Sequence, residues 1–286
     1  MKRHDRVVKA VGGLLAFALL AGGSGSAAAA APANLSAEQI VERNIAARGG
    51  SDAWREVKSI AFTGQMDAGQ VHPNPGPEIT DQRELKIHVK RNHPEKLEAP
   101  KNVALPFRLE LKRPHKTRLE VQFQGQTAVQ VYDGQVGYKY RPYLNRTDWQ
   151  SFTPEEARLA SDQQELDGPL LDYRAKGTRI ALDGTDKVDD RDAYRLKLTL
   201  ANGEVRHVWV DAQNFLDVKI DGQRRMDGRE KTMFTVQKDF RKVNGVTVPF
   251  LLETSVEGIN RVESIHVEKA ELNPRLDDAR FVRPSG

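Results

Sequence analysis

The feature that most constrains the fold of this chain is a two-residue alternation of apolar and polar side chains. The runs that show it most clearly are 85–89, 107–111, 119–123, 196–200 and 234–240. Successive side chains of a β-strand point to opposite faces of the sheet. The pattern therefore predicts strands that bury one face and leave the other face in water.

Turn-forming pairs separate these runs. The pairs are Gln124-Gly125, Asp133-Gly134, Asn202-Gly203, Asp221-Gly222 and Asn244-Gly245. Asn-Gly and Asp-Gly are strong signals for tight hairpin turns. A spacing of about eight to twelve residues between turns predicts a long antiparallel meander of about ten strands.

Two segments begin with helix signals instead. Ser36 and Gln39 stand at capping-box positions, and Gly49-Gly50 suits the end of that helix. Thr153 before Pro154 begins a second helix, which we expect to run to Gln164 and to be followed by a short piece at 166–173. Amphipathic helices need an apolar surface to cover. We therefore expect a mainly β (α+β) fold, a strongly curved antiparallel sheet or half-open β-barrel whose concave apolar face the helices cover.

The first 33 residues have the pattern of a cleaved secretory signal peptide. A basic start is followed by an apolar core at 11–21 and by an A-x-A cleavage site at Ala31–Ala33. The apolar core is too short for a transmembrane helix, which needs about 20 residues. We expect residues 34–286 to form a single domain that is soluble in the periplasm.

Charge and composition exclude several classes of protein. The formal net charge is +4, but residues 1–31 carry +3 of it, so the rest of the chain is nearly neutral. Nucleic-acid binding draws most of its affinity from clustered cations, which argues against that function. The chain has no cysteine, so disulfides, thiol nucleophiles and thiolate zinc sites are excluded.

The search for catalytic or metal-binding motifs finds none, and we expect no enzyme, no cofactor and no metal site. His88 and His93 have no ligand-type neighbour in sequence, which favours surface polar residues over a metal pair. An acidic cluster lies at Asp186, Asp189, Asp190 and Asp192. It fits a hairpin turn better than a calcium site, because the EF-hand spacing is missing.

Aromatic residues gather between the first strands and the central helix, at Tyr132, Tyr138, Tyr140, Tyr143, Trp149 and Phe152. They fit either a sheet core with its rim or an apolar cleft between the sheet and its helices. Candidate lining residues of such a cleft, some of which must be plain core, are Val121, Val131, Tyr140, Leu171, Leu198, Trp209, Phe234 and Phe250.

Several motifs, in this order and spacing, resemble outer-membrane lipoprotein-sorting proteins of the LolA-like kind. They are residues 35–50 with Trp54, 113–120 running into 128–134, 167–173, 194–200, 243–250 and 277–281. The resemblance implies a half-open barrel with a helical lid over an apolar cavity. It also implies a non-enzymatic carrier that takes lipoprotein acyl chains, or another lipid, from an inner-membrane exporter to an outer-membrane acceptor.

Two features set this chain apart from the compact carriers. Pro-rich stretches at 69–81 and 92–106 lengthen it, so its cargo can be another lipid. The resemblance also implies an arginine in an early strand that holds the lid shut, for which Arg83 is the candidate by position.

Other classes of protein remain as alternatives. A lipid-sensing periplasmic regulator or scaffold would use the same sheet. An outer-membrane barrel would show lipid-facing hydrophobic residues where this chain has Lys, Arg and Glu. A hydrolase would need a nucleophile beside a base, and no such pair is evident.

Overall fold

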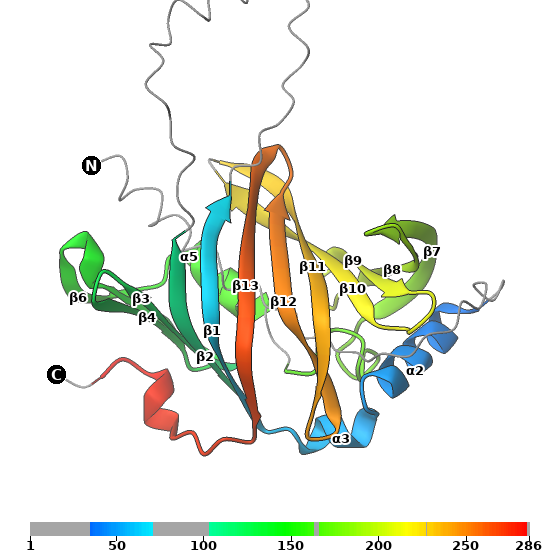
Figure 1. Cartoon of the computed structure of the whole chain (residues 1–286), viewed down its shortest axis with the longest axis horizontal. Helices are drawn as coiled ribbons and strands as arrows, with labels where there is room; N and C mark the ends of the chain where they lie inside the picture. Colours follow the sequence, from blue (N-terminus) through cyan, green and yellow to red (C-terminus); the bar gives the residue numbers. More distant parts are fainter. Residues whose placement is uncertain (1–34, 71–102, 163–165, 227, 285–286) are drawn as a thin grey trace, which may run out of the picture.

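The structure is a computed structural model that describes residues 35–70, 103–162, 166–226 and 228–284. Within these ranges a single antiparallel sheet has 13 strands, in the order β6-β5-β4-β3-β2-β1-β13-β12-β11-β10-β9-β8-β7. The sheet is curved and does not close, and its edge strands β6 and β7 lie at opposite sides of the molecule (Figure 1). The curved antiparallel sheet is as predicted, with more strands than the ten expected. The signal segment 1–33, the run at 85–89 and Arg83 lie outside the described residues.

The strands of the first half of the sheet are β1 (Ser59–Gln70), β2 (Ala104–Lys112), β3 (Lys116–Phe123), β4 (Gln126–Tyr132), β5 (Gly137–Arg141) and β6 (Arg146–Ser151). Those of the second half are β7 (Arg179–Val188), β8 (Arg191–Thr199), β9 (Val205–Asp211), β10 (Asp217–Met226), β11 (Arg229–Val243), β12 (Val246–Val256) and β13 (Ile259–Leu272). Each half is a meander, and the two join where β1 pairs with β13, with Ile60 opposite Leu272. The chain must therefore cross from one edge of the sheet to the other between β6 and β7.

The helices begin where the sequence predicts. Helix α2 (Ala37–Ala47) has the capping box of Ser36 and Gln39. Helix α3 (Ser51–Glu56) follows it after Gly49, whose φ is 108° and where a Cβ would lie 2.3 Å from the carbonyl oxygen of Gly245. Helix α5 (Pro154–Asp162) is capped by Thr153, whose hydroxyl accepts from the amide of Glu156. Short 3-10 helices are η1 (Pro142–Leu144) and η2 (Asp278–Phe281).

One face of the sheet, here called the inner face, carries the two largest apolar clusters. The first joins β1–β4, β12 and β13 and includes Phe62, Leu109 and Leu119; the second joins α2 with β8–β10. The crossing segment 166–177 packs against both, because Leu171 belongs to the first cluster and Leu170 to the second. A single short segment reaches both halves because the sheet curves around it, which makes the inner face the concave one.

One predicted turn is wrong. Asp221-Gly222 lies inside β10, whereas the other predicted pairs do join strands. The side chain of Asp221 accepts from the backbone amide of His207 on β9 at 2.6 Å and contacts the ring nitrogen Nδ1 of that histidine at 2.7 Å. An Asp-Gly pair favours a turn when it is considered alone. Here the contacts of Asp221 with His207 on the neighbouring strand hold the pair in extended conformation. Of the two Pro-rich stretches, 69–81 contributes its first two residues to β1 and 92–106 its last three residues to β2, so neither is entirely a loop.

Candidate functional site

The crossing between β6 and β7 covers the inner face with two different pieces, helix α5 and the segment 166–177. In Figure 1 helix α5 lies behind the central strands β1 and β13. The segment 166–177 is buried deeply: Leu166, Leu170, Leu171 and Tyr173 all belong to the core. This segment therefore fills the inner face at one end of the molecule with the protein's own side chains.

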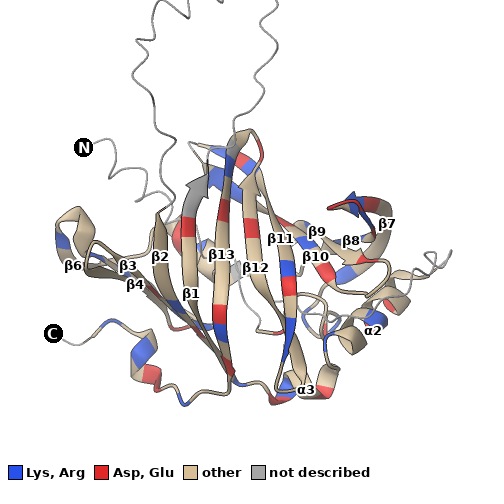
Figure 2. Cartoon of the chain, in the orientation of Figure 1, with Lys and Arg blue, Asp and Glu red and all other residues tan. Residues whose placement is uncertain are grey.

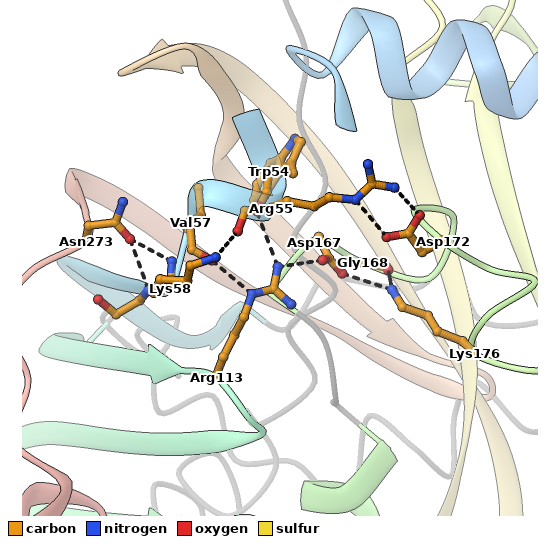
Figure 3. A network of polar contacts seen from close by, with 11 residues as sticks. Trp54, Arg55, Val57, Lys58, Arg113, Asp167, Gly168, Asp172, Lys176 and Asn273 are labelled. Carbon is orange, nitrogen blue, oxygen red and sulfur yellow. Dashed lines mark hydrogen bonds and ion pairs between the residues drawn. The ribbon is translucent and has the colours of Figure 1, made fainter. Parts of the chain in front are cut away.

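A buried carboxylate holds the segment 166–177 in place (Figure 3). Asp167 accepts from the guanidinium of Arg113 at 2.6 Å and from the ammonium of Lys176 at 2.9 Å. Arg113 also donates to the carbonyl oxygens of Val57 and Trp54. Burial works to raise the pKa of Asp167, but Lys176 and Arg113 outweigh it and hold that pKa below its usual value. The network ties the segment to β2 and to the end of α3.

Exposed pairs extend this network. Arg55 donates to Asp172 at 2.7 Å, and the side-chain oxygen of Asn273 accepts from the amide of Lys58 at 2.6 Å (Figure 3). The first pair links α3 with the segment 166–177, and the second links the start of β1 with the residue that follows β13. Every partner here serves to join chain segments, so the network is structural.

Helix α5 is attached through ion pairs to both halves of the sheet. Glu156 pairs with Lys139 on β5, and Arg158 pairs at 3.0 Å with Glu204, in the turn between β8 and β9. Burial works to raise the pKa of Glu156, but hydrogen bonds from Lys139 and the Thr153 amide lower it overall. The helix thus bridges strands from both halves of the sheet, with most of its side chains partly exposed.

The inner face is open at Gly222. This residue shares a face of β10 with Ile220, which belongs to an inner-face cluster, and lies opposite Met233 on β11. Among the described residues, no atom apart from its chain neighbours would lie within 4 Å of a Cβ at this position. Its backbone has no positive φ, unlike the glycines in turns. Gly222 therefore marks free space on the concave side of the sheet.

Polar side chains lie next to this space on the inner face. We call the set of Arg224, Thr235, Gln237, Thr254, Arg261 and Glu263 the polar patch. Thr235 lies opposite both Ile220 and Thr254, and Thr254 lies opposite Glu263, so these residues form one row across β10–β13. Burial raises the pKa of Glu263, against the opposing effect of Arg261 and Arg224.

Four of the lining residues predicted from sequence lie on the inner side. Val121, Leu171 and Phe250 meet in the first cluster, and Leu198 belongs to the second. All of them are buried. In this conformation they are core residues, Leu171 within the segment 166–177 itself and the other three in the clusters that this segment and α2 complete, and a role in binding would need one of the covers to move.

The other predicted lining residues lie on the outer face. Val131 and Tyr138 pair with each other, and Val131 also lies opposite Arg118, whose guanidinium donates to the carbonyl oxygen of Arg280 in η2. Tyr140 lies on this face as well and stacks on Trp149. The C-terminal 3-10 helix thus covers Val131 from outside, which the alternation alone does not reveal.

Trp209 and Phe234 are also outer-face residues. They pack edge to face at 6.4 Å in a third cluster, and the ammonium of Lys219 lies over both rings. The indole of Trp209 donates to Asp186. An apolar patch and a long cation cover these rings, so the expected placement on the concave face does not hold for them.

The charged residues of the described ranges do not meet the requirements of a metal site. Within the described ranges no three His, Asp or Glu side chains come together as a metal site would require. Asp189 and Asp190 form the turn between β7 and β8, and His88 and His93 lie outside the described residues. Charged residues of both signs occur along β11 and β13, whereas β12 has one charged residue, Glu253 (Figure 2). No helix in the described part of the chain is long and apolar enough to cross a bilayer.

Comparison with solved structures gives several neighbours of the whole fold. A LolA-superfamily protein from Nitrosomonas europaea matches with a TM-score of 0.54 at 13% identity, covering 87% of this chain and 99% of that one. A domain from Vibrio parahaemolyticus, assigned as an outer membrane lipoprotein-sorting protein, matches with a TM-score of 0.50 at 9% identity, covering 78% and 89%.

The fold is LolA-like. A DUF1329-family protein from Desulfovibrio piger has a similar fold, with a TM-score of 0.52 at 13% identity over 86% of this chain and 96% of that one. No family model and no curated protein matches the sequence. The resemblance found in the motifs is thus confirmed at the level of the fold.

Sequence reasoning missed Gly222 and Gln237 as residues of interest. The Asp-Gly pair places Gly222 in a turn, and Gln237 lies within a run whose neighbours Phe234 and Val236 draw attention to the opposite face. The signal that could have found them is the alternation itself: residues 235 and 237 fall on the face that elsewhere carries leucine and phenylalanine. Polar residues at such positions show where the inner face changes from apolar to polar.

Proposed function

We propose that this protein is a non-enzymatic periplasmic carrier that binds lipoprotein acyl chains, or another lipid, on the concave face of its sheet. The observation that carries the proposal is the space at Gly222, on the inner face of a LolA-like sheet whose cover α5 is attached to the strands by two ion pairs. Each buried methylene of an acyl chain gains about 0.8 kcal/mol. A dry, coverable surface is therefore sufficient to keep a lipid out of water.

The chemistry of the inner face supports a carrier over an enzyme. The buried carboxylates of its covers are engaged in ion pairs that join segments, as Asp167 and Glu156 are. Binding and release would need only the movement of α5, which the Lys139–Glu156 and Arg158–Glu204 pairs hold to the sheet. The predicted signal at 1–33 would deliver the chain to the periplasm, where an inner-membrane exporter and an outer-membrane acceptor would be its partners.

The test is lipid binding by protein prepared from the periplasm. We expect lipids extracted from the purified chain to give one dominant class by mass spectrometry, and a fluorescent fatty-acid probe to bind the delipidated protein in a one-to-one ratio. Denatured protein serves as the control for adventitious lipid. Absence of both copurified lipid and probe binding would contradict the carrier and favour a scaffold or regulator built on the same sheet.

A further inference from the structure

The inner face changes from apolar to polar between two adjacent rows of side chains. One row contains Gln237, Leu252, Ile265 and Met66, each opposite the next across β11, β12, β13 and β1. All but Gln237 belong to the first apolar cluster. The next row toward Gly222 is the polar one, with Thr235, Thr254 and Glu263. Gln237 thus lies where the apolar core meets the polar patch.

Gln237 is completely buried, with 0% exposure, and neither its amide nitrogen nor its amide oxygen has a hydrogen-bond partner in the structure. Its strand neighbours face outward: Val236 packs beside Trp209, and Lys238 pairs with Glu253. A buried polar group without partners destabilises a folded protein. An unpaired amide at this position is a cost that a ligand can offset.

The remaining groups of the polar patch are engaged with one another. The hydroxyls of Thr235 and Thr254 lie 3.0 Å apart, and a guanidinium nitrogen of Arg261 lies 3.5 Å from Glu263. Arg224 acts electrostatically on the same carboxyl group. One nitrogen of Arg261, Nε, is also buried without a hydrogen-bond partner. Gln237 differs from the rest of the patch because both of its side-chain polar atoms lack a partner, the amide nitrogen as donor and the amide oxygen as acceptor.

We infer that the polar patch is a head-group subsite, in which Gln237 binds a neutral group that both donates and accepts a hydrogen bond, beside the acyl chain of a bound amphiphile. An amide bond and a hydroxyl group both have this chemistry. An ester linkage has acceptor oxygens but no donor. It could therefore accept a hydrogen bond from the amide nitrogen of Gln237, but the amide oxygen of Gln237 would stay unpaired. The acyl chain would occupy the inner face from Gly222 onward.

This inference rests on the proposed function, and the experiment separates the two. Three competitors with the same acyl chain are compared in displacing the fluorescent fatty-acid probe: N-methyldodecanamide, glycerol monododecanoate and methyl dodecanoate. We expect the amide or the hydroxyl compound to displace the probe at a concentration about tenfold lower than the methyl ester, as one added hydrogen bond allows. Which of the two does so identifies the source of the group.

Gln237→Leu tests the residue itself. Leucine fills a similar volume without a polar group, so we expect a melting temperature equal to or above that of the wild type and equal displacement by all three compounds. Gln122→Leu is the matched control, because Gln122 is exposed on the outer face of β3. We expect it to keep the wild-type preference.

Each outcome bears on one of the two proposals or on both. A wild type that binds the probe but is displaced equally by all three compounds overturns the subsite and leaves the carrier standing. The subsite is likewise overturned if Gln237→Leu retains the preference. A wild type that binds neither probe nor competitor overturns both the subsite and the carrier.

Discussion

The two covers of the inner face differ in how they are held, although they follow each other directly in the chain. The segment 166–177 inserts fully buried leucines between the two halves of the sheet and is tied by Asp167, which is 6% exposed. The side chains of helix α5 are mostly half-buried, and the helix is held by the Lys139–Glu156 pair, in which the lysine is buried, and by the half-exposed Arg158–Glu204 pair. Half-exposed ion pairs contribute little to stability, whereas buried leucines contribute much. The segment is therefore part of the core, and the helix is the cover that we propose to move.

Truncating a leucine should give the largest difference in stability between the two covers. We expect Leu170→Ala, at a fully buried position, to lower the free energy of unfolding by about 3 kcal/mol. Leu159→Ala, on the partly buried α5, should lower it by about 1 kcal/mol or less. Urea unfolding followed by circular dichroism measures both. Equal losses would show that α5 is as much a part of the core as the segment 166–177.

Neutralising the buried carboxylate should have the next largest effect. We expect Asp167→Asn to cost about 2 kcal/mol, because Arg113 and Lys176 lose their common partner. Asp172→Asn is the control: Asp172 pairs with Arg55 but is 41% exposed, so its loss should cost about 0.5 kcal/mol.

The same variant should alter the dependence of stability on pH. The folded-state pKa of Asp167 lies below the unfolded value, which is about 3.9 for an aspartate. Its stabilisation is therefore present above the unfolded pKa and is lost as the pH falls through the folded pKa. Asp167→Asn should lose less stability than the wild type on acidification from neutral pH to the acid limit of folding. Parallel curves for the two proteins would contradict this role.

Added salt should change the hydrogen exchange of the two covers differently. Of the effects considered, this one should alter overall stability least. Raising the ionic strength to about 1 M shortens the screening length to about 3 Å and weakens exposed ion pairs first. We expect hydrogen exchange of α5 to become faster while that of 166–177 stays unchanged. Glu204→Gln should reproduce the acceleration at low salt, since it removes the charge that pairs with Arg158 at the more exposed of the two sites. Unchanged exchange in both segments would mean that the Arg158–Glu204 pair does not hold α5.

The parts of the fold that sequence predicts are those set by local chemistry. The caps at Ser36 and Thr153 and the hairpin at Asn244-Gly245 depend on neighbouring residues alone, and they are found where expected. The opposite holds for Asp221-Gly222, whose turn propensity is overridden by His207 on the next strand. Long-range pairing of this kind has no signature in a single stretch of sequence.

The face that a strand buries was also only partly predictable. Alternation shows that Val131 and Trp209 share faces with other apolar residues, but it does not say which side each face is on. The outer face is covered at Val131 by η2, from the far end of the chain, and at Trp209 by Phe234 and Lys219. In the sequence, apolar residues of local patches on the convex side therefore cannot be told from lining residues of the concave side.

The most direct test of lipid binding on the concave face fills the space at Gly222. Gly222→Phe adds a ring where, apart from the chain neighbours of Gly222, no described atom stands within 4 Å of the added Cβ and where φ is not positive, so the sheet should fold with an unchanged melting temperature. Gln122→Phe, on the exposed outer face of β3, is the matched control. We predict that Gly222→Phe weakens binding of the fluorescent fatty-acid probe by about tenfold or more while the control binds as the wild type does. Wild-type affinity in a well-folded Gly222→Phe protein would contradict binding on the concave face.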